Sequence, residues 1–417
     1  MRLPVLLVLM GVLFSQCPTA SARIWGDAEG KLKVEAELVK TEGGDALLKE
    51  KDGRVFRVPF SFLRTEDQQF IQQWIQKQSI QKAASPYAAE AKLNEAFALE
   101  VTPTKKVNTE FSIKVTTPQL KAKEWIVFAS APPQTAGQKV TASLVPQGTT
   151  VRDLNSFTRS VMMARIPARG ASQEQSITPR VIIEAELFAR KLVSRSGQAK
   201  PAEPLSRIDR ASFLRETSLI DHGSEAFQQW LQVQGLERNK GESQIGYARR
   251  TFLHVRQSFS YDYRAEMNRL GSHICEAGQS DCGGLAIVFV SALRAYDIPA
   301  RLLAGRWAKS SEEGARLKGV DYHRQHVKAE FYADGVGWVP VDLTTGDLPD
   351  KDTEGLRYFG NDLGDFVTLH FDHGLKVDTI HFGEAEVKWM QSTRYWVTGS
   401  GSLDGSTTVK TWVVVER

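Results

Sequence analysis

Residues 279–295 read QSDCGGLAIVFVSALRA, so that small and turn-forming residues give way to an apolar run of helical length. This change predicts a helix that begins at or next to Cys282. At a helix start, unpaired backbone N–H groups and the positive end of the helix dipole favour a thiolate over a thiol. Gly283 and Gly284 would let another chain approach the sulfur closely, at a cost of roughly 1 kcal/mol each in helix propensity. The segment therefore predicts a reactive cysteine at Cys282.

A thiolate nucleophile needs a base beside it and a third group to orient that base. Residues 326–342 read HVKAEFYADGVGWVPVD and predict a β-hairpin with Ala333-Asp334-Gly335 as a three-residue loop. In that register His326 lies directly opposite Asp342, so that the carboxylate could orient the imidazole. A two-residue Asp-Gly loop would shift the register by one residue and place the two side chains on opposite faces.

Two alternatives remain open within this hairpin. His323 is a second candidate base, although a position three residues earlier would place it on the other face or in the preceding loop. Asp342 could instead cap a turn at the end of its strand. We favour His326 with Asp342.

The residues around these three positions follow an informative order. They are Asp281-Cys282-Gly283, Leu293-Arg294-Ala295, Asp297-Ile298-Pro299-Ala300-Arg301, His326 with Glu330, and Gly337-Trp338-Val339-Pro340-Val341-Asp342. In order and spacing they resemble the transglutaminase-like core family, over about Gln244 to Thr345. The resemblance implies a papain-like α+β core with Cys282 as the nucleophile, His326 as the base and Asp342 as the residue that orients the base.

The resemblance also implies a reaction and its partners. Cys282 would attack an amide carbonyl of a protein or peptide, His326 would protonate the leaving amine, and the thioester would pass to water or to an amine. This chemistry requires no cofactor. His370, His373 and His381 lie near Asp362 and Asp365, but their spacing fits no standard zinc pattern, and no metal site is expected.

Three further residues are candidates for the cleft. Family members usually carry an aromatic residue two positions after the histidine, where this chain has Lys328. On the hairpin, Lys328 lies on the face of His326, where it would narrow or charge the cleft and disfavour an imidazolium. Gln279 could donate to an oxyanion hole beside the Cys282 amide, and Trp338 is a candidate cleft residue.

Residues 1–22 differ in character from the rest of the chain. One positive charge at Arg2 precedes an almost entirely apolar run from Leu3 to Phe14, and Ala20-Ser21-Ala22 offers a small-x-small cleavage site. The run is about twelve residues long, short of the ~20 that span a bilayer. We expect a secretory signal peptide cleaved after Ala22, no membrane span after cleavage, and a secreted or periplasmic protein.

Export makes the remaining cysteines informative. Cleavage leaves Cys275 and Cys282, which could form one small disulfide loop or include a working thiol. With the disulfide, the chain would be a structural protein of the cell envelope. A third interpretation is a catalytically inactive transglutaminase-like scaffold whose N-terminal barrel binds proteins.

Composition bounds the remaining possibilities. The chain has 417 residues, of which 41% are hydrophobic and 24% charged, which excludes a wholly disordered, collagen-like or multi-span membrane protein. At ~100–200 residues per domain, two to four domains are expected. A formal net charge of +4, from 53 basic and 49 acidic residues, gives no argument for a nucleic-acid partner.

Residues 23–78 show the alternation of side-chain character that is typical of a small β-domain. Strands are predicted at 34–39, 46–48 and 55–58, and a helix is predicted to begin at Thr65. Arg23-Ile24-Trp25, Val34-Glu35-Ala36, Asp52-Gly53 and Val58-Pro59 resemble the Sla-type homology domain, a small SH3-like barrel, which implies a protein ligand. After it we expect a linker over 79–97, a β-sandwich over 98–200 and the transglutaminase-like core over 205–350. A C-terminal β extension over 351–417 would close one edge of the core.

Overall fold

The computed structural model of the chain describes residues 22–27, 30, 33–42, 45–82, 87–156, 158–168, 175–196, 200–264, 266–312, 316–317, 320–321, 323–344 and 355–417. They fall into two compact units, within residues 1–81 and 82–417. The signal peptide expected at 1–22 lies outside the described residues, apart from Ala22. Among the helices of the described ranges, none is both long and apolar enough to cross a membrane.

The first unit is a small antiparallel sheet with one packed helix. Strands β1 (Arg23–Gly26), β2 (Lys33–Glu42), β3 (Asp45–Glu50) and β4 (Val55–Pro59) pair in that order, and a 3-10 turn η1 (Phe60–Phe62) leads into α1 (Thr65–Lys82). Alternate strand residues face inward, so that Trp25, Leu38 and Leu48 are buried with Ile71 of α1. The predicted strands and the helix start at Thr65 are confirmed, and the sheet agrees with an SH3-like domain.

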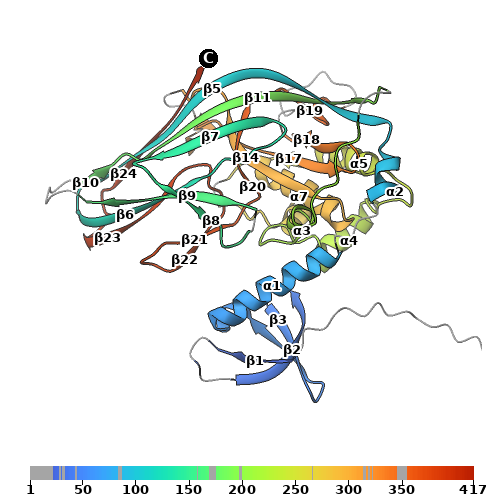
Figure 1. Ribbon diagram of the computed structural model, residues 1–417, viewed down its shortest axis with the longest axis horizontal. Helices are drawn as coiled ribbons and strands as arrows, with labels where there is room; N and C mark the ends of the chain where they lie inside the picture. Colours follow the sequence, from blue (N-terminus) through green and yellow to red (C-terminus); the bar gives the residue numbers. More distant parts are fainter. Residues whose placement is uncertain are drawn as a thin grey trace, which may run out of the picture. The chain divides into compact units, whose positions relative to one another are not determined.

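The second unit contains a β-sandwich. One sheet holds β5 (Phe97–Thr117), β7 (Gln138–Val145), β10 (Gln175–Ile177), β11 (Arg180–Ser194) and β24 (Thr407–Glu416), and the other holds β6 (Leu120–Ser130), β8 (Thr149–Arg152), β9 (Ser160–Pro167) and β23 (Arg394–Gly401). The sheets form two layers in Figure 1, and side chains such as Val127, Ile183 and Trp412 fill the space between them.

The α+β core packs an almost fully buried helix, α7 (Cys282–Ala295), against an antiparallel sheet. The sheet order is β18 (Gly337–Val341), β17 (Gln325–Ala333), β14 (Ala300–Trp307) and β20 (Phe366–Phe371). Helix α7 is apolar nearly all round, because it contacts this sheet on one side and α5 and α6 on others. The expected α+β core behind a β-sandwich is confirmed.

Shorter elements complete the second unit. Its other helices are α2 (Tyr87–Leu93), α3 (Arg207–Ser212), α4 (Glu225–Val233), α5 (Gln244–Ser258) and α6 (Gly271–Ala277). The short strands pair as β12 (Ser260–Tyr261) with β13 (Gln279–Ser280), β15 (Arg316–Leu317) with β16 (Val320–Asp321), β21 (Leu375–Asp378) with β22 (Glu384–Val387), and β19 (Asn361–Asp362) with β11.

The C-terminal segment differs in part from its expected place at the edge of the core. Strand β20 does pair with β14 at that edge, whereas β23 and β24 pair with β6 and β5 and complete the sandwich. Trp412 explains the position of β24, because its indole is fully buried between the two sheets while Val409 and Val413 of the same strand are exposed. The alternation fits a strand with one buried face.

Residues 79–97 also differ from the expected linker. They include the end of α1, all of α2 and the start of β5. Asn94 is fully buried and donates to Gln244 Oε1 at 2.9 Å, and Arg238 pairs with Glu90 of α2 at 2.8 Å. The Lys-, Gln- and Ala-rich composition that suggests a linker is equally suited to a short helix.

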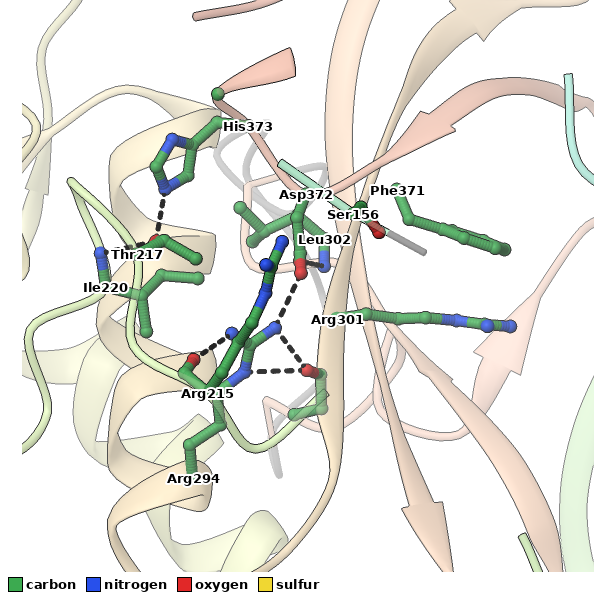
Figure 2. A network of polar contacts seen from close by, with 12 residues as sticks. Ser156, Arg215, Thr217, Ile220, Arg294, Arg301, Leu302, Phe371, Asp372 and His373 are labelled. Carbon is green, nitrogen blue, oxygen red and sulfur yellow. Dashed lines mark hydrogen bonds and ion pairs between the residues drawn. The ribbon is translucent and has the colours of Figure 1, made fainter. Parts of the chain in front are cut away.

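A buried ion pair fixes the C-terminal end of α7 (Figure 2). Arg294 Nη2 lies 2.8 Å from Asp372 Oδ2, and the guanidinium also donates to the carbonyl oxygen of Ala300. Asp372 Oδ1 accepts a hydrogen bond from the Leu302 amide at 3.0 Å. These contacts join α7, β14 and the chain after β20, and so set the position of Cys282 at the other end of the helix.

Candidate active site

Cys282 is the first residue of α7. Asp281 before it has an extended backbone, and its Oδ1 accepts a hydrogen bond from the Gly284 amide at 3.0 Å. Such a cap satisfies an amide that the helix itself leaves unpaired. Arg269 pairs with the same carboxylate, its Nη2 lying 2.7 Å from Asp281 Oδ2. The helix start predicted next to Cys282 is confirmed.

The two cysteines are not joined. Both Cys275 and Cys282 are free thiols, so the disulfide alternative does not hold in this structure. Cys275 lies on α6 among apolar side chains, and burial raises the pKa of its thiol well above the usual range. Cys282 is half-buried at the N-terminal end of a helix. The two thiols therefore have different environments.

Gly283 and Gly284 both lie against other parts of the chain. A Cβ added to Gly283 would lie 3.3 Å from Cζ2 of Trp389, which comes from the C-terminal segment. A Cβ added to Gly284 would lie 1.9 Å from Ser280 Oγ and 2.6 Å from Ser280 Cβ. The glycine pair therefore makes room for an indole at one position and for a serine of β13 at the other. The approach of another chain to the sulfur stays a prediction.

A Gly284→Ala variant tests this packing. Alanine favours a helix over glycine by about 1 kcal/mol. Overlap with Ser280 is expected to reverse that gain and lower the free energy of unfolding by about 1–3 kcal/mol, measured by guanidinium denaturation. The double variant Ser280→Gly/Gly284→Ala removes the overlapping atoms and should recover most of the loss. An equal loss in the double variant would contradict the explanation.

His326 lies at the start of β17, and its Nε2 is 2.9 Å from Oδ2 and 3.0 Å from Oδ1 of Asp342. The hairpin register is shifted by two residues from the predicted one, because Ala333 pairs with Gly337 and the loop is Asp334-Gly335-Val336. His326 and Asp342 are thus diagonal neighbours rather than directly opposed. A shift of two keeps both side chains on one face, and a diagonal pair is still within reach of an imidazole and a carboxylate.

The surroundings of His326 favour its charged form. Burial opposes the charge, but the carboxylate of Asp342, by its charge and hydrogen bond, and the side-chain hydrogen bond to Cys282 together raise the pKa of His326 to about 10. Because Nε2 is used by Asp342, Nδ1 is the ring nitrogen left for the sulfur. The structure therefore brings the three predicted side chains together, from Cys282 to His326 to Asp342.

Two aromatic rings hold the imidazole. Trp307 of β14 stacks on His326 with ring centroids 4.9 Å apart and 20° between the ring planes, and Phe366 of β20 meets it edge to face at 6.1 Å. The Gln391 side chain donates to the carbonyl oxygens of Gly305 and His326, each at 2.8 Å. The ring and the strand beneath it are thus both fixed.

Lys328 contacts Trp307, as His326 does, but its charge is paired. Its Nζ lies 3.3 Å from Asp362 Oδ1 and 4.5 Å from the centroid of the Trp307 ring. The expectation that Lys328 disfavours an imidazolium is wrong, because a carboxylate offsets the ammonium and the pKa of His326 is raised rather than lowered.

Trp338 lies away from this group. It pairs with Tyr332, six residues along β17 from His326, which corresponds to roughly 20 Å of strand. Its ring lies 3.8 Å from the Arg301 guanidinium carbon and packs against Phe213, in a cavity of about 440 Å³. The prediction that Trp338 lines the cleft at Cys282 is wrong for this reason.

The other candidate residues have clear positions. Gln279 is half-buried in β13, three residues before Cys282, and its role as an oxyanion donor stays a prediction. His323 lies before β17, where its carbonyl oxygen accepts a hydrogen bond from Arg306. His326 Nε2 contacts Asp342 at 2.9 Å, as predicted for the favoured base.

Three further histidines have separate partners. His370 Nε2 accepts a hydrogen bond from the Met390 amide at 3.1 Å, His373 Nε2 lies 2.6 Å from Thr217 Oγ1 (Figure 2), and His381 Nε2 lies 2.8 Å from Glu124 Oε2. In the part of the chain that the structure describes, no group of three or more His, Cys, Asp or Glu side chains is placed to hold a metal ion.

Comparison with known families matches two separate parts of the chain. Residues 233–343 match the transglutaminase-like superfamily, and residues 15–79 match the SLA1 homology domain 1. The chain carries a transglutaminase-like domain. No curated protein matches the chain.

Solved structures similar to this chain share little sequence with it. A protein from Cytophaga hutchinsonii, proposed to be a cysteine protease, is 12% identical with a TM-score of 0.44, and the match covers 76% of this chain and 94% of that one. The periplasmic domain of TgpA from Pseudomonas aeruginosa, bound to ethylmercury, is 15% identical with a TM-score of 0.28, over 62% of this chain and 94% of that domain.

The transglutaminase-like domain does not supply every residue of the site. Phe366, Trp389 and Gln391 all lie beyond its last matched residue, and sequence reasoning missed them. Trp307 lies inside the domain and was also missed. Its position at the end of an apolar strand, ARLLAGRW, is the signal that could have placed it beside the start of the His326 strand.

Proposed function

We propose that the transglutaminase-like domain is a cysteine-dependent acyl-transfer enzyme that acts on amides of proteins or peptides. The observation that carries the proposal is the hydrogen bond from His326 to Asp342 at 2.9 Å, in an imidazole whose pKa this carboxylate and Cys282 raise, with Cys282 at a helix start. A thiolate beside an imidazolium is a nucleophile at neutral pH and has an acid ready for the leaving group.

The proposed reaction has two steps. The Cys282 sulfur bonds to the amide carbonyl carbon, the C–N bond breaks, and the His326 imidazolium gives its Nδ1 proton to the leaving nitrogen, which departs as an amine. This leaves a thioester on Cys282 and a neutral imidazole. Water or an amine then attacks the thioester, the imidazole takes its proton, and the thiolate leaves. Water completes a hydrolysis, and an amine completes a cross-link.

Three further parts of the proposal come from the sequence. Gln279 and the Cys282 amide would hold the charge that develops on the carbonyl oxygen. The apolar segment from Leu3 to Phe14 supports an exported protein. The SLA1 homology domain would bind a protein ligand.

Selective labelling of the two thiols tests the proposal. At pH 6 an ordinary thiol with a pKa of about 8.5 is less than about 1% thiolate. Iodoacetamide at this pH is therefore expected to label Cys282 and leave the buried Cys275 unmodified, as read by mass spectrometry. A His326→Ala variant should label Cys282 at least about tenfold more slowly, because the imidazolium that stabilises the thiolate is gone.

The same experiment separates the enzyme from an inactive scaffold. Slow labelling of Cys282 that does not change in His326→Ala would contradict the acyl-transfer proposal and favour the scaffold. The matched control is His381→Ala, because His381 is bound to Glu124 on the sandwich. This control should leave the labelling rate of Cys282 unchanged.

A further inference from the structure

Trp389 is a half-buried indole next to the proposed nucleophile. It lies between β22 and β23, and its Cζ2 is 3.3 Å from the position of a Cβ on Gly283. Gly283 directly follows Cys282 in the first turn of α7. The missing side chain at Gly283 therefore lets the indole approach the first turn of α7, one residue from Cys282.

The backbone that carries Trp389 is fixed on its C-terminal side. The Met390 amide donates to His370 Nε2 at 3.1 Å, and Met390 itself is fully buried. The Gln391 side chain donates to the carbonyl oxygen of His326 at 2.8 Å. An aromatic ring on such a backbone is in place before a ligand arrives, so that little conformational entropy is lost on binding.

The rings that flank Trp389 are uncharged. His370 and His373 lie at centroid distances of 6.3 and 6.0 Å from the indole. Burial is the main reason that the pKa of His370 is lowered to about 4 and that of His373 to about 3, so that both are neutral at pH 7. At the helix start, the Asp281 carboxylate is paired with Arg269. The Arg394 guanidinium contacts the backbone of Trp389, where its Nη2 donates to the carbonyl oxygen at 3.3 Å. The groups around the indole ring suit an apolar ligand group better than a charged one.

We propose that the exposed face of Trp389 is one wall of a subsite that holds an apolar, preferably aromatic, side chain of the acyl donor while its amide lies at Cys282. This inference rests on the proposed function and names the substrate class of the same site. Trp389 makes no bond in the reaction. It acts on specificity, through the offset or edge-to-face ring contacts that aromatic pairs prefer at centroid distances of about 4.5–7 Å.

Two alkylating reagents of different size test the subsite. Iodoacetamide is small, and N-benzyl iodoacetamide adds an aromatic ring to the same reactive group. In the intact chain, Cys282 is expected to react faster with the benzyl reagent than with iodoacetamide. Trp389→Ala should lower the ratio of the two rates about tenfold and leave the iodoacetamide rate nearly unchanged. Trp389→Phe should keep most of the ratio, since it keeps an aromatic face.

Two more variants guard against a folding defect. Gly283→Ala forces the indole of Trp389 to move by a few tenths of an ångström while the tryptophan itself is kept. This variant should lower the ratio of the benzyl rate to the iodoacetamide rate. Trp338→Ala removes an indole that lies elsewhere, against Phe213 and Arg301, and should leave the ratio unchanged. It is the matched control for the loss of a tryptophan.

The outcomes separate the subsite from the proposed function. If Cys282 reacts quickly with both reagents, and Trp389→Ala and Gly283→Ala leave their ratio unchanged, the subsite is overturned and the proposed function stands. Equal slowing of both reagents in Trp389→Ala would assign Trp389 a purely structural role, which also overturns the subsite. If Cys282 of the unaltered chain reacts no faster than an ordinary thiol, the proposed function fails, and the subsite fails with it.

Discussion

An Asp342→Asn variant is expected to titrate His326 below pH 6.5 instead of near pH 10, and to lose at least about 100-fold in the rate of acyl transfer. Asparagine keeps the shape of the side chain and one hydrogen-bond acceptor, but it removes the negative charge. Burial is the largest influence on this pKa and is then opposed only by the contact with Cys282, so we expect it to favour the neutral ring. At pH 7 the variant would hold a neutral imidazole beside a thiol in place of the ion pair.

The raised pKa of His326 also predicts how the rate of acyl transfer depends on pH. A raised pKa of about 10 means that His326 stays protonated through neutral pH and loses its proton only as the pH rises through that value. Release of the amine needs that proton, so turnover of the unaltered protein should fall above pH 10. In Asp342→Asn the fall should begin below pH 6.5.

Two measurements check this prediction. NMR titration of the His326 ring gives the pKa directly, and single-turnover release of amine from a fluorogenic peptide library gives the rate. Asp153→Asn is the matched control, because Asp153 is a buried aspartate paired with Arg159 at 2.6 Å outside the site. It should leave the His326 titration in place. A His326 pKa near 10 in Asp342→Asn would refute the assignment of Asp342 as the orienting residue.

Local sequence signals predicted the helix start at Cys282 well. The start of α7 follows from Asp281 as a cap and from the change between turn-forming and apolar residues, all within a few positions of Cys282. The register of the hairpin was harder to predict, because the position of the loop fixes it. The chain uses Asp334-Gly335-Val336 as its loop in place of the predicted Ala333-Asp334-Gly335. The error was two residues, so the face on which His326 and Asp342 lie was still correct.

The family motifs identified charged residues of the core, but they did not identify the distant residues that form ion pairs with them. Arg294 and Glu330 both belong to the recognised motifs, and both form buried ion pairs. Their partners Asp372 and Arg190 lie 78 and 140 residues away, beyond the reach of spacing arguments. The same distance hid Trp389, since nothing near it in sequence marks it as a neighbour of Cys282.

A Glu330→Gln variant is expected to lower the free energy of unfolding by about 3–5 kcal/mol. Glu330 is fully buried on β17, where Arg190 Nη1 lies 2.5 Å from Oε2 and Arg301 Nη2 lies 2.5 Å from Oε1. Arg190 comes from the sandwich strand β11 and Arg301 from the core strand β14. The carboxylate therefore ties the two sheets together, four residues from His326, and its removal leaves two buried guanidinium groups short of a negative charge.

The charge of Glu330 also determines how the stability effect of Glu330→Gln depends on pH. Burial raises the pKa of a carboxyl group, but Arg301 and Arg190 outweigh burial here and hold the pKa of Glu330 below its usual range. A carboxyl group whose pKa is lowered by folding stabilises the folded protein at pH values above the ordinary carboxyl pKa. This stabilisation is lost as the pH falls through the lowered pKa. Glu330→Gln should therefore lose most stability at neutral pH and differ least from the unaltered protein in strong acid.

Denaturation in guanidinium chloride measures the change, and the exposed pair of Glu110 with Arg180, at 3.3 Å, provides the control. Glu110→Gln should cost less than about 1 kcal/mol, because water screens exposed pairs. If Glu330→Gln costs no more than this control, the ion pairs do not hold the sheets together. The double variant Glu330→Gln/Arg301→Met should be more stable than Glu330→Gln alone. It removes the Arg301 guanidinium, which loses its carboxylate in Glu330→Gln, whereas Arg190 keeps Asp362 at 2.8 Å. Methionine can fill the space between Trp338 and Phe371, whose ring centroids both lie 3.8 Å from the guanidinium carbon.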